Sequence, residues 1–158
     1  MLHAKVVDTS KKELIELSRA EEFLNQSKFG ALIYFIGTVR DISENKKVKG
    51  ITYDAKDSMV IKSFEEIYNE ADNKLNIKDK AVFIEHVKGY VGLKEKSIII
   101  GVGCKHRDQA YALSRYIIEE IKIRSPIWKK EHYENDESEW LKGSPIQTNY
   151  NLFCSQNP

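Results

Sequence analysis

The segment from Lys122 to Lys130 places four cations within nine residues, a density that suits the binding of an anion. Pro126 should end the helix before it, because proline lacks an amide donor and forces the preceding residue toward extended geometry. Lys122 and Arg124 are then expected at a helix C-terminus, and Lys129 and Lys130 on the extended segment that follows. Such lysines can act as a base or nucleophile, or hold a phosphate or carboxylate. The alternative is that Lys122 and Arg124 only stabilise the helix dipole.

Two further cationic positions lie where strands are expected to end. His106 and Arg107 follow an apolar strand and begin a helix, where free backbone amides attract anions. Arg40 follows Thr38 and Val39 at the end of another apolar run, a position where sheet proteins often carry functional groups. The alternatives are that His106 is a turn residue, that Arg107 is a solvated surface charge, and that the strand before Arg40 simply ends in solvent.

Three other residues are typical of purely structural roles. His86 lies in a strand pattern and is typical of a structural histidine. Trp128 and Trp140 are typical of core or interface anchors, although either can cover a flat heterocycle.

The bulk composition excludes several classes of function. With 25 basic and 24 acidic side chains, the net charge of +1 creates no global field for nucleic acid or membranes. The sequence has no Walker A loop, dinucleotide-binding glycine motif, His-Glu-x-x-His or Cys-x-x-Cys, so metal and nucleotide-cofactor chemistry are disfavoured. Cys104 and Cys154 are too few for a disulfide framework, and no run suits a signal peptide or membrane span. We therefore expect a cytoplasmic protein without a cofactor or metal.

The apolar periodicity predicts one α+β domain over residues 1–158, with a mostly antiparallel sheet and two long helices packed on it. The tail from about residue 141 is expected to be mobile. A strand at 30–36 reads as buried on both faces, residues 41–50 as a mobile loop, and residues 88–92 as a turn. The two long helices are expected at 58–75 and 108–124, and two short helices at 11–19 and 20–26. The other expected strands cover 3–7, 51–53, 81–87, 97–103 and 127–133.

Four segments and a tryptophan form an ordered pattern along the chain. They are Gly30-Ala31 leading to Phe35–Arg40, His86 with Gly89, Gly101–Arg107 with Ala110 and Tyr111, Lys122–Glu131, and Trp140. In this pattern the sequence resembles the large, catalytic subunit of molybdopterin synthase, the MoaE family. Val87 and Lys94 depart from it, since the family usually has arginine and glycine at these positions.

The resemblance implies an α/β-hammerhead fold and a sulfurtransferase that converts cyclic pyranopterin monophosphate to molybdopterin. It implies that sulfur arrives as a thiocarboxylate on the C-terminal Gly-Gly of a small ubiquitin-like subunit. It also implies a homodimer within a heterotetramer, in which the neighbouring protomer supplies the His-Arg pair. By matching position, Lys122 is implied as the catalytic lysine and Lys129 as the second. The implied substrate-binding residues are Thr38, Val39, Arg40, His106, Arg107, Lys122, Lys129, Lys130 and Glu131.

Two alternatives from other classes stay open on the residues alone. The lysines could bind the C-terminal tail of a ubiquitin-like protein without catalysing a reaction, or the basic cluster could bind RNA. The near-zero net charge and the absence of an aromatic platform motif disfavour RNA.

Overall fold

A computed structural model describes residues 1–135 and 137–141 of the chain. The predicted tail beyond residue 141, including Cys154, lies outside the described residues, so the single domain over 1–158 stays a prediction. The strands are β1 (Leu2–Asp8), β2 (Ala31–Thr38), β3 (Ile42–Ser43), β4 (Lys46–Ala55), β5 (Lys80–Gly92), β6 (Lys96–Cys104), β7 (Ile127–Tyr133) and β8 (Ser138–Trp140). A 3-10 turn, η1 (Thr9–Lys11), and the helices α1 (Leu17–Leu24), α2 (Asp57–Leu75) and α3 (Arg107–Arg124) complete the described part.

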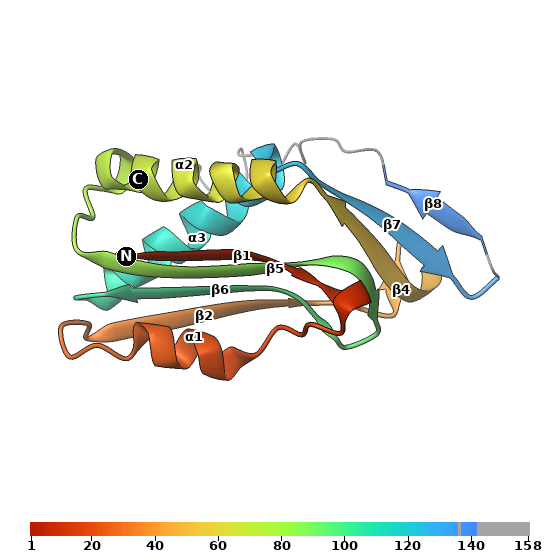
Figure 1. Cartoon of the computed structure of the whole chain (residues 1–158), viewed down its shortest axis with the longest axis horizontal. Helices are drawn as coiled ribbons and strands as arrows, with labels where there is room; N and C mark the ends of the chain where they lie inside the picture. The colour runs from red at the N-terminus through yellow and green to blue at the C-terminus, as the bar shows by residue number, and fades with distance from the viewer. Residues whose placement is uncertain (136, 142–158) are drawn as a thin grey trace, which may run out of the picture.

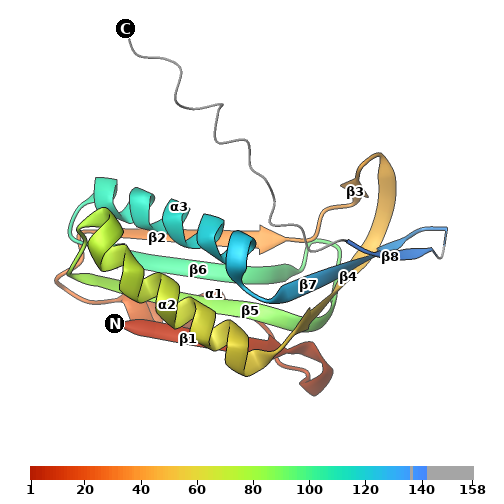
Figure 2. The ribbon, with the colours of Figure 1, turned by 90° about the horizontal axis from the view of Figure 1, so that it is seen from above.

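The described strands form one sheet in the order β2-β6-β5-β4-β7-β8, with β1 added on β5 and β3 on β4. Every described pairing is antiparallel except that of β1 with β5. The helices α2 and α3 lie next to each other over one face, and α1 covers the other face (Figures 1 and 2). The predicted α+β class, with two long helices on a mostly antiparallel sheet, is confirmed.

The long strand β5 joins two parts of the sheet. Its first half pairs with β6 from Lys80 to His86, and its second half pairs with β4 from Gly89 to Gly92. Gly89 has a φ of 102°, a conformation that glycine adopts without steric cost, so the strand can bend there. The predicted turn at 88–92 is therefore wrong, because the glycines allow a bent strand instead of ending it.

Apolar side chains fill both faces of the sheet. Phe64 and Ile67 of α2 and Leu113 and Ile117 of α3 pack with the inner residues of β5 and β6. On the opposite face, Ala20 of α1 joins a second buried cluster with residues that include Val7, Phe83 and Ile99. No helix in the described part of the chain is long and apolar enough to cross a membrane.

The predicted helix at 11–19 is wrong. The carboxylate of Asp8 accepts a hydrogen bond from the Ser10 amide at 3.0 Å and closes the 3-10 turn η1 instead. Lys12 then adopts a left-handed φ of 62°, which ends the turn. A single helix, α1, begins only at Leu17 and replaces the two short helices expected between residues 11 and 26.

Two other expectations are also corrected. β2 is not buried on both faces: it is an edge strand that pairs only with β6 among the described strands, and Leu32 is 41% exposed. Residues 41–50 form a hairpin of β3 and β4, with Glu44 and Asn45 at positive φ values of 47° and 65°. Positive φ at both central residues is the geometry that tight hairpins favour, so the polar composition here marks a turn between strands.

Candidate active site

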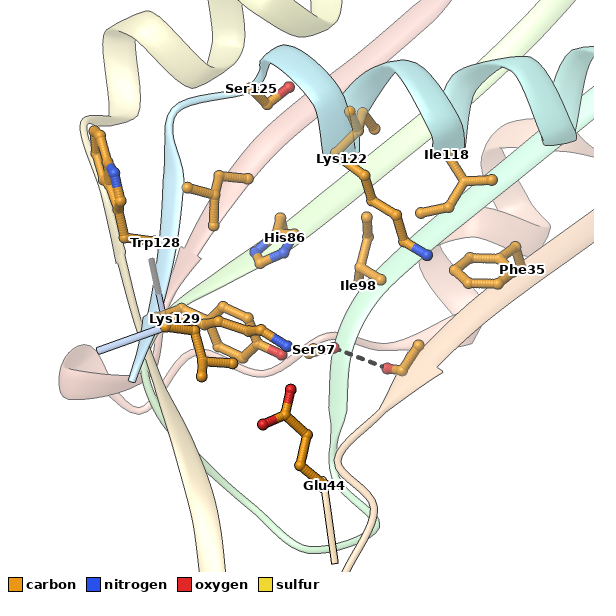
Figure 3. A pocket seen from close by; sticks show the side chains of 15 residues that line it. Phe35, Glu44, His86, Ser97, Ile98, Ile118, Lys122, Ser125, Trp128 and Lys129 are labelled. Atoms are coloured by element: carbon orange, nitrogen blue, oxygen red, sulfur yellow. Dashed lines mark hydrogen bonds between the residues drawn. The ribbon is translucent and has the colours of Figure 1, made fainter. Parts of the chain in front are cut away.

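A cavity of about 570 Å³ lies beneath the last turn of α3, where the two parts of the sheet meet (Figure 3). Its size suits a small ligand or the end of a peptide. The cavity is lined in part by polar residues, which come from α3, β5, β6, β7 and the β3–β4 turn. The rest of the lining is a largely apolar wall. The apolar wall consists of Phe35, Ile98, Ile118, Ile121, Ile127, Trp128 and Leu141.

Lys122 reaches this cavity from the last turn of α3 (Figure 3). The helix ends at Ser125, whose extended backbone (φ −75°, ψ 132°) is the geometry expected before Pro126. The hydroxyls of Ser125 and Ser63 are 2.7 Å apart and tie this helix end to α2. Among the ion pairs of the described residues, none involves Lys122, so its ammonium group is available to a ligand.

Lys129 enters the same cavity from β7, and an acidic neighbour holds it. Its Nζ lies 3.7 Å from Oε1 of Glu131, which is 3% exposed. The hydroxyl of Tyr133 donates a hydrogen bond to the other carboxylate oxygen of Glu131 at 3.1 Å. Glu131 is therefore fixed behind Lys129, and it does not line the cavity itself.

The other two cations of the segment point elsewhere. Arg124 makes two hydrogen bonds to the Glu70 carboxylate, at 3.0 and 2.9 Å, and its Nε lies 3.2 Å from Glu120. Lys130 lies over the ring of Trp140, 5.8 Å from the ring centroid. Since successive side chains of a strand point to opposite faces, Lys130 lies on the face of β7 opposite Lys129.

His86 also lines the cavity, which the sequence did not indicate. It lies on β5, is 8% exposed, and its ring meets the Tyr53 ring at 78°, with 5.0 Å between the ring centroids. Its Nδ1 donates a hydrogen bond to the Val87 carbonyl at 2.8 Å. Burial lowers the pKa of His86 to about 4, so the imidazole is neutral near pH 7. Burial also raises the pKa of Tyr53, which keeps its hydroxyl protonated.

The structure does not bring His106 and Arg107 to the lysines of the same chain. His106 occupies the N-cap position of α3 without a side-chain capping bond, Arg107 is the first helical residue, and both are exposed. Lys122 comes fifteen residues after Arg107 on the same helix, so their backbones are about 22 Å apart at 1.5 Å per residue.

Thr38, Val39 and Arg40, at and just beyond the end of β2, do not line the main cavity. Arg40 is exposed beyond the strand, and Val39 is only 2% exposed, with its amide bonded to Glu95 O at 3.2 Å. Thr38 lines a second cavity of about 400 Å³, which also contacts the two positions that depart from the family pattern, Val87 and Lys94.

Within the described residues, no cluster of three or more His, Cys, Asp or Glu side chains could hold a metal ion. The cavity combines two ammonium groups, the carboxylate of Glu44, a neutral imidazole and an apolar wall. Such a surface can bind an anion and stabilise negative charge that develops during a reaction.

Comparisons with known proteins identify the family of the chain. The MoaE protein family model matches residues 10–124. The molybdopterin synthase catalytic subunit of Synechococcus elongatus is 38% identical over 130 residues, covering 82% of this chain and 78% of that protein. The corresponding protein of Pyrococcus abyssi is 35% identical over 141 residues, covering 89% and 93%.

Solved structures have the same fold. Molybdopterin synthase from Staphylococcus aureus superposes with a TM-score of 0.78 at 31% identity, covering 87% of this chain and 95% of that one. A complex of subunits 1 and 2 of molybdopterin-converting factor from Helicobacter pylori has a TM-score of 0.68 at 24% identity, covering 88% and 90%, and shows the fold alone. The sequence matches and the shared fold show that the chain belongs to the MoaE family of molybdopterin synthase catalytic subunits.

Proposed function

We propose that this chain converts cyclic pyranopterin monophosphate to molybdopterin, using the thiocarboxylate sulfur of a small ubiquitin-like subunit. The observation that carries the proposal is the meeting of Lys122 and Lys129, from α3 and β7, at one cavity. Both proposed ligands are anions, and a cavity with two ammonium groups and an apolar wall suits them. With only two cysteines in the sequence, the protein has the composition of a cytoplasmic enzyme, and we propose that location.

The two lysines have different roles in this proposal. Lys122, which has no ion-pair partner among the described residues, stabilises the negative charge that develops on the acyl oxygen when water attacks the thiocarboxylate carbon. The carbon–sulfur bond then breaks, the sulfur stays on the pterin, and the carrier leaves as a carboxylate. Lys129, held by Glu131, orients the anionic substrate beside it. The apolar wall limits the access of water and strengthens both interactions.

We propose that the functional unit contains two copies of this chain, each with one small subunit. His106 and Arg107 bind substrate in this proposal, although they are about 22 Å from Lys122 along their own helix. They can reach the lysine cavity only if another copy supplies them. The exposure of both side chains at the start of α3 supports such a contribution. Arg40, Thr38, Val39 and Lys130 are proposed to extend the substrate surface beyond the cavity.

Replacing Lys122 by alanine tests the function. Lys122 is exposed, so Lys122→Ala should fold like the wild type, while product formation from the pterin and the thiocarboxylated carrier falls by at least about 10²–10³-fold. Lys62→Ala is the matched control, because Lys62 is an exposed helical lysine 4.0 Å from Glu66 and outside the cavity. Wild-type turnover in Lys122→Ala would contradict the proposed role. If the wild type binds a Gly-Gly tail and forms no product, the chain is a binding module.

A further inference from the structure

His86 has a free hydrogen-bond acceptor inside the cavity. Its Nδ1 donates to the Val87 carbonyl at 2.8 Å, and a carbonyl can only accept, so Nδ1 carries the proton. Nε2 of this neutral ring then has a lone pair and no hydrogen. Within residues 1–135 and 137–141 no hydrogen bond reaches Nε2, although the side chain is only 8% exposed. Among the described residues Nε2 is not one of the fully buried polar atoms that lack a partner, so it opens onto the cavity, where a ligand or water can donate to it.

None of the described groups that share the cavity donates a hydrogen bond to Nε2, so a ligand can supply the donor in place of water. The Ser97 hydroxyl already donates to the Gly37 carbonyl at 3.2 Å, and the Tyr53 ring lies at 78° to the imidazole ring. Lys122 and Lys129 reach the same cavity from α3 and β7 (Figure 3). Glu44, from the β3–β4 turn, is the acidic side chain that lines it. The cavity therefore presents two cations for an anion, one carboxylate, and a neutral acceptor for an N–H group.

We infer that Nε2 of His86 accepts a hydrogen bond from an N–H group of the ligand whose anionic end is held by Lys122 and Lys129. The inference rests on the proposed function and specifies its ligand: an anion with an N–H donor a few atoms away. The C-terminal residue of a peptide has this chemistry, because its backbone amide lies next to its carboxylate or thiocarboxylate. A pterin phosphate offers a ring N–H instead, so the two sources have to be separated by experiment.

Two substitutions separate the two nitrogens of the ring. Asparagine places an amide near the position of Nδ1, so His86→Asn can keep the bond to Val87 O but loses the acceptor in the cavity. Glutamine reaches the position of Nε2, so His86→Gln keeps an acceptor there. Thermal denaturation first establishes that both variants are folded.

Binding is then measured by calorimetry with a peptide ending in Gly-Gly as a free carboxylate, and separately with the pterin monophosphate. We expect His86→Asn to lose about tenfold in affinity for the peptide, and His86→Gln to stay within about threefold of the wild type. A peptide whose last amide is N-methylated has no donor. It should bind the wild type about tenfold more weakly and should not distinguish the wild type from His86→Asn.

The outcomes separate this inference from the proposed function. A loss confined to the pterin supports the acceptor and assigns its donor to the pterin ring. Unchanged affinity of folded His86→Asn for both ligands overturns the inference, even if the enzyme is active. An effect of His86→Asn on binding in a protein without turnover supports the acceptor while the proposed function fails. A wild type that binds neither ligand overturns both.

Discussion

Gly37 lies on β2 at a position where a side chain would collide with the wall of the cavity. A Cβ at this position would be 2.7 Å from Cγ2 of Ile98 and 3.4 Å from the hydroxyl of Ser97. Ile98 is 6% exposed and cannot move outward freely, and Ser97 is bonded to the Gly37 carbonyl. The Gly37→Ala substitution must therefore displace β2 or Ile98, and either movement changes the shape of the cavity.

The expected cost follows from two opposing terms. Overpacking by one methyl group costs about 1–3 kcal/mol. Replacing glycine by alanine also restricts the unfolded chain, which offsets about 0.4–1 kcal/mol of that cost. Gly37→Ala should thus lower the free energy of unfolding by about 1–2 kcal/mol, a fall in Tm of about 2–8 °C for a domain of this size. Affinity for a Gly-Gly peptide should fall as well, because Ile98 lines the cavity.

Gly92→Ala is the matched control, because Gly92 is also a strand glycine. The nearest atom to its added Cβ is Oε2 of Glu95, at 3.3 Å; this exposed carboxylate accepts a hydrogen bond from the Gly92 amide at 2.6 Å and has to shift only by a few tenths of an ångström. Its free energy of unfolding should stay within about 0.5 kcal/mol of the wild type. Thermal and urea denaturation of both variants, with peptide calorimetry, make the comparison. If Gly37→Ala is as stable as Gly92→Ala and binds the peptide normally, the steric argument is refuted.

Two further predictions concern stability, and urea denaturation measures both. The Lys80 side chain is fully buried, pairs with Asp72 and contacts Ile77 O at 3.3 Å, whereas Asp72 is 44% exposed. Asp72→Ala leaves a buried ammonium unpaired and should lower the free energy of unfolding by about 3 kcal/mol, while Lys80→Met should lower it by about 1 kcal/mol. Equal losses in the two variants would contradict this asymmetry. Lys94 has a φ of 66°, so Lys94→Gly should stabilise the protein by about 1 kcal/mol, and a loss of stability would exclude strain at this turn.

The sequence predicted the long elements of the fold because their periodicity repeats over several turns. The stripe of Phe64 and Ile67 on α2 and of Leu113 and Ile117 on α3 marks buried helix faces without any knowledge of the partner strands. Edges were not predictable in this way. The apolar run of β2 is typical of an interior strand, and only the pairing order shows that it has one neighbour in the described sheet. The helix expected at 11–19 failed because a local bond of Asp8 competes with helix formation.

The candidate site was predictable only where local chain geometry determines it. Pro126 fixes the end of α3, so the positions of Lys122 and Lys129 on two sides of a short connection follow from the sequence. The role of His86 does not follow in this way. A single histidine in an apolar strand gives no periodic signal, and its access to the cavity depends on pairing between β5, β4 and β6, which are distant in sequence.

The same local periodicities explain why only two of the four cations in the segment serve the cavity. Residues on a helix are separated by 100°, so Arg124 lies about 200° around α3 from Lys122 and pairs with Glu70. Residues on a strand alternate, so Lys130 points away from Lys129 and lies over Trp140. Because Glu131 offsets much of the charge of Lys129, the uncompensated charge of the cavity is concentrated at Lys122. An anion should therefore bind first at Lys122, where the proposed chemistry requires it.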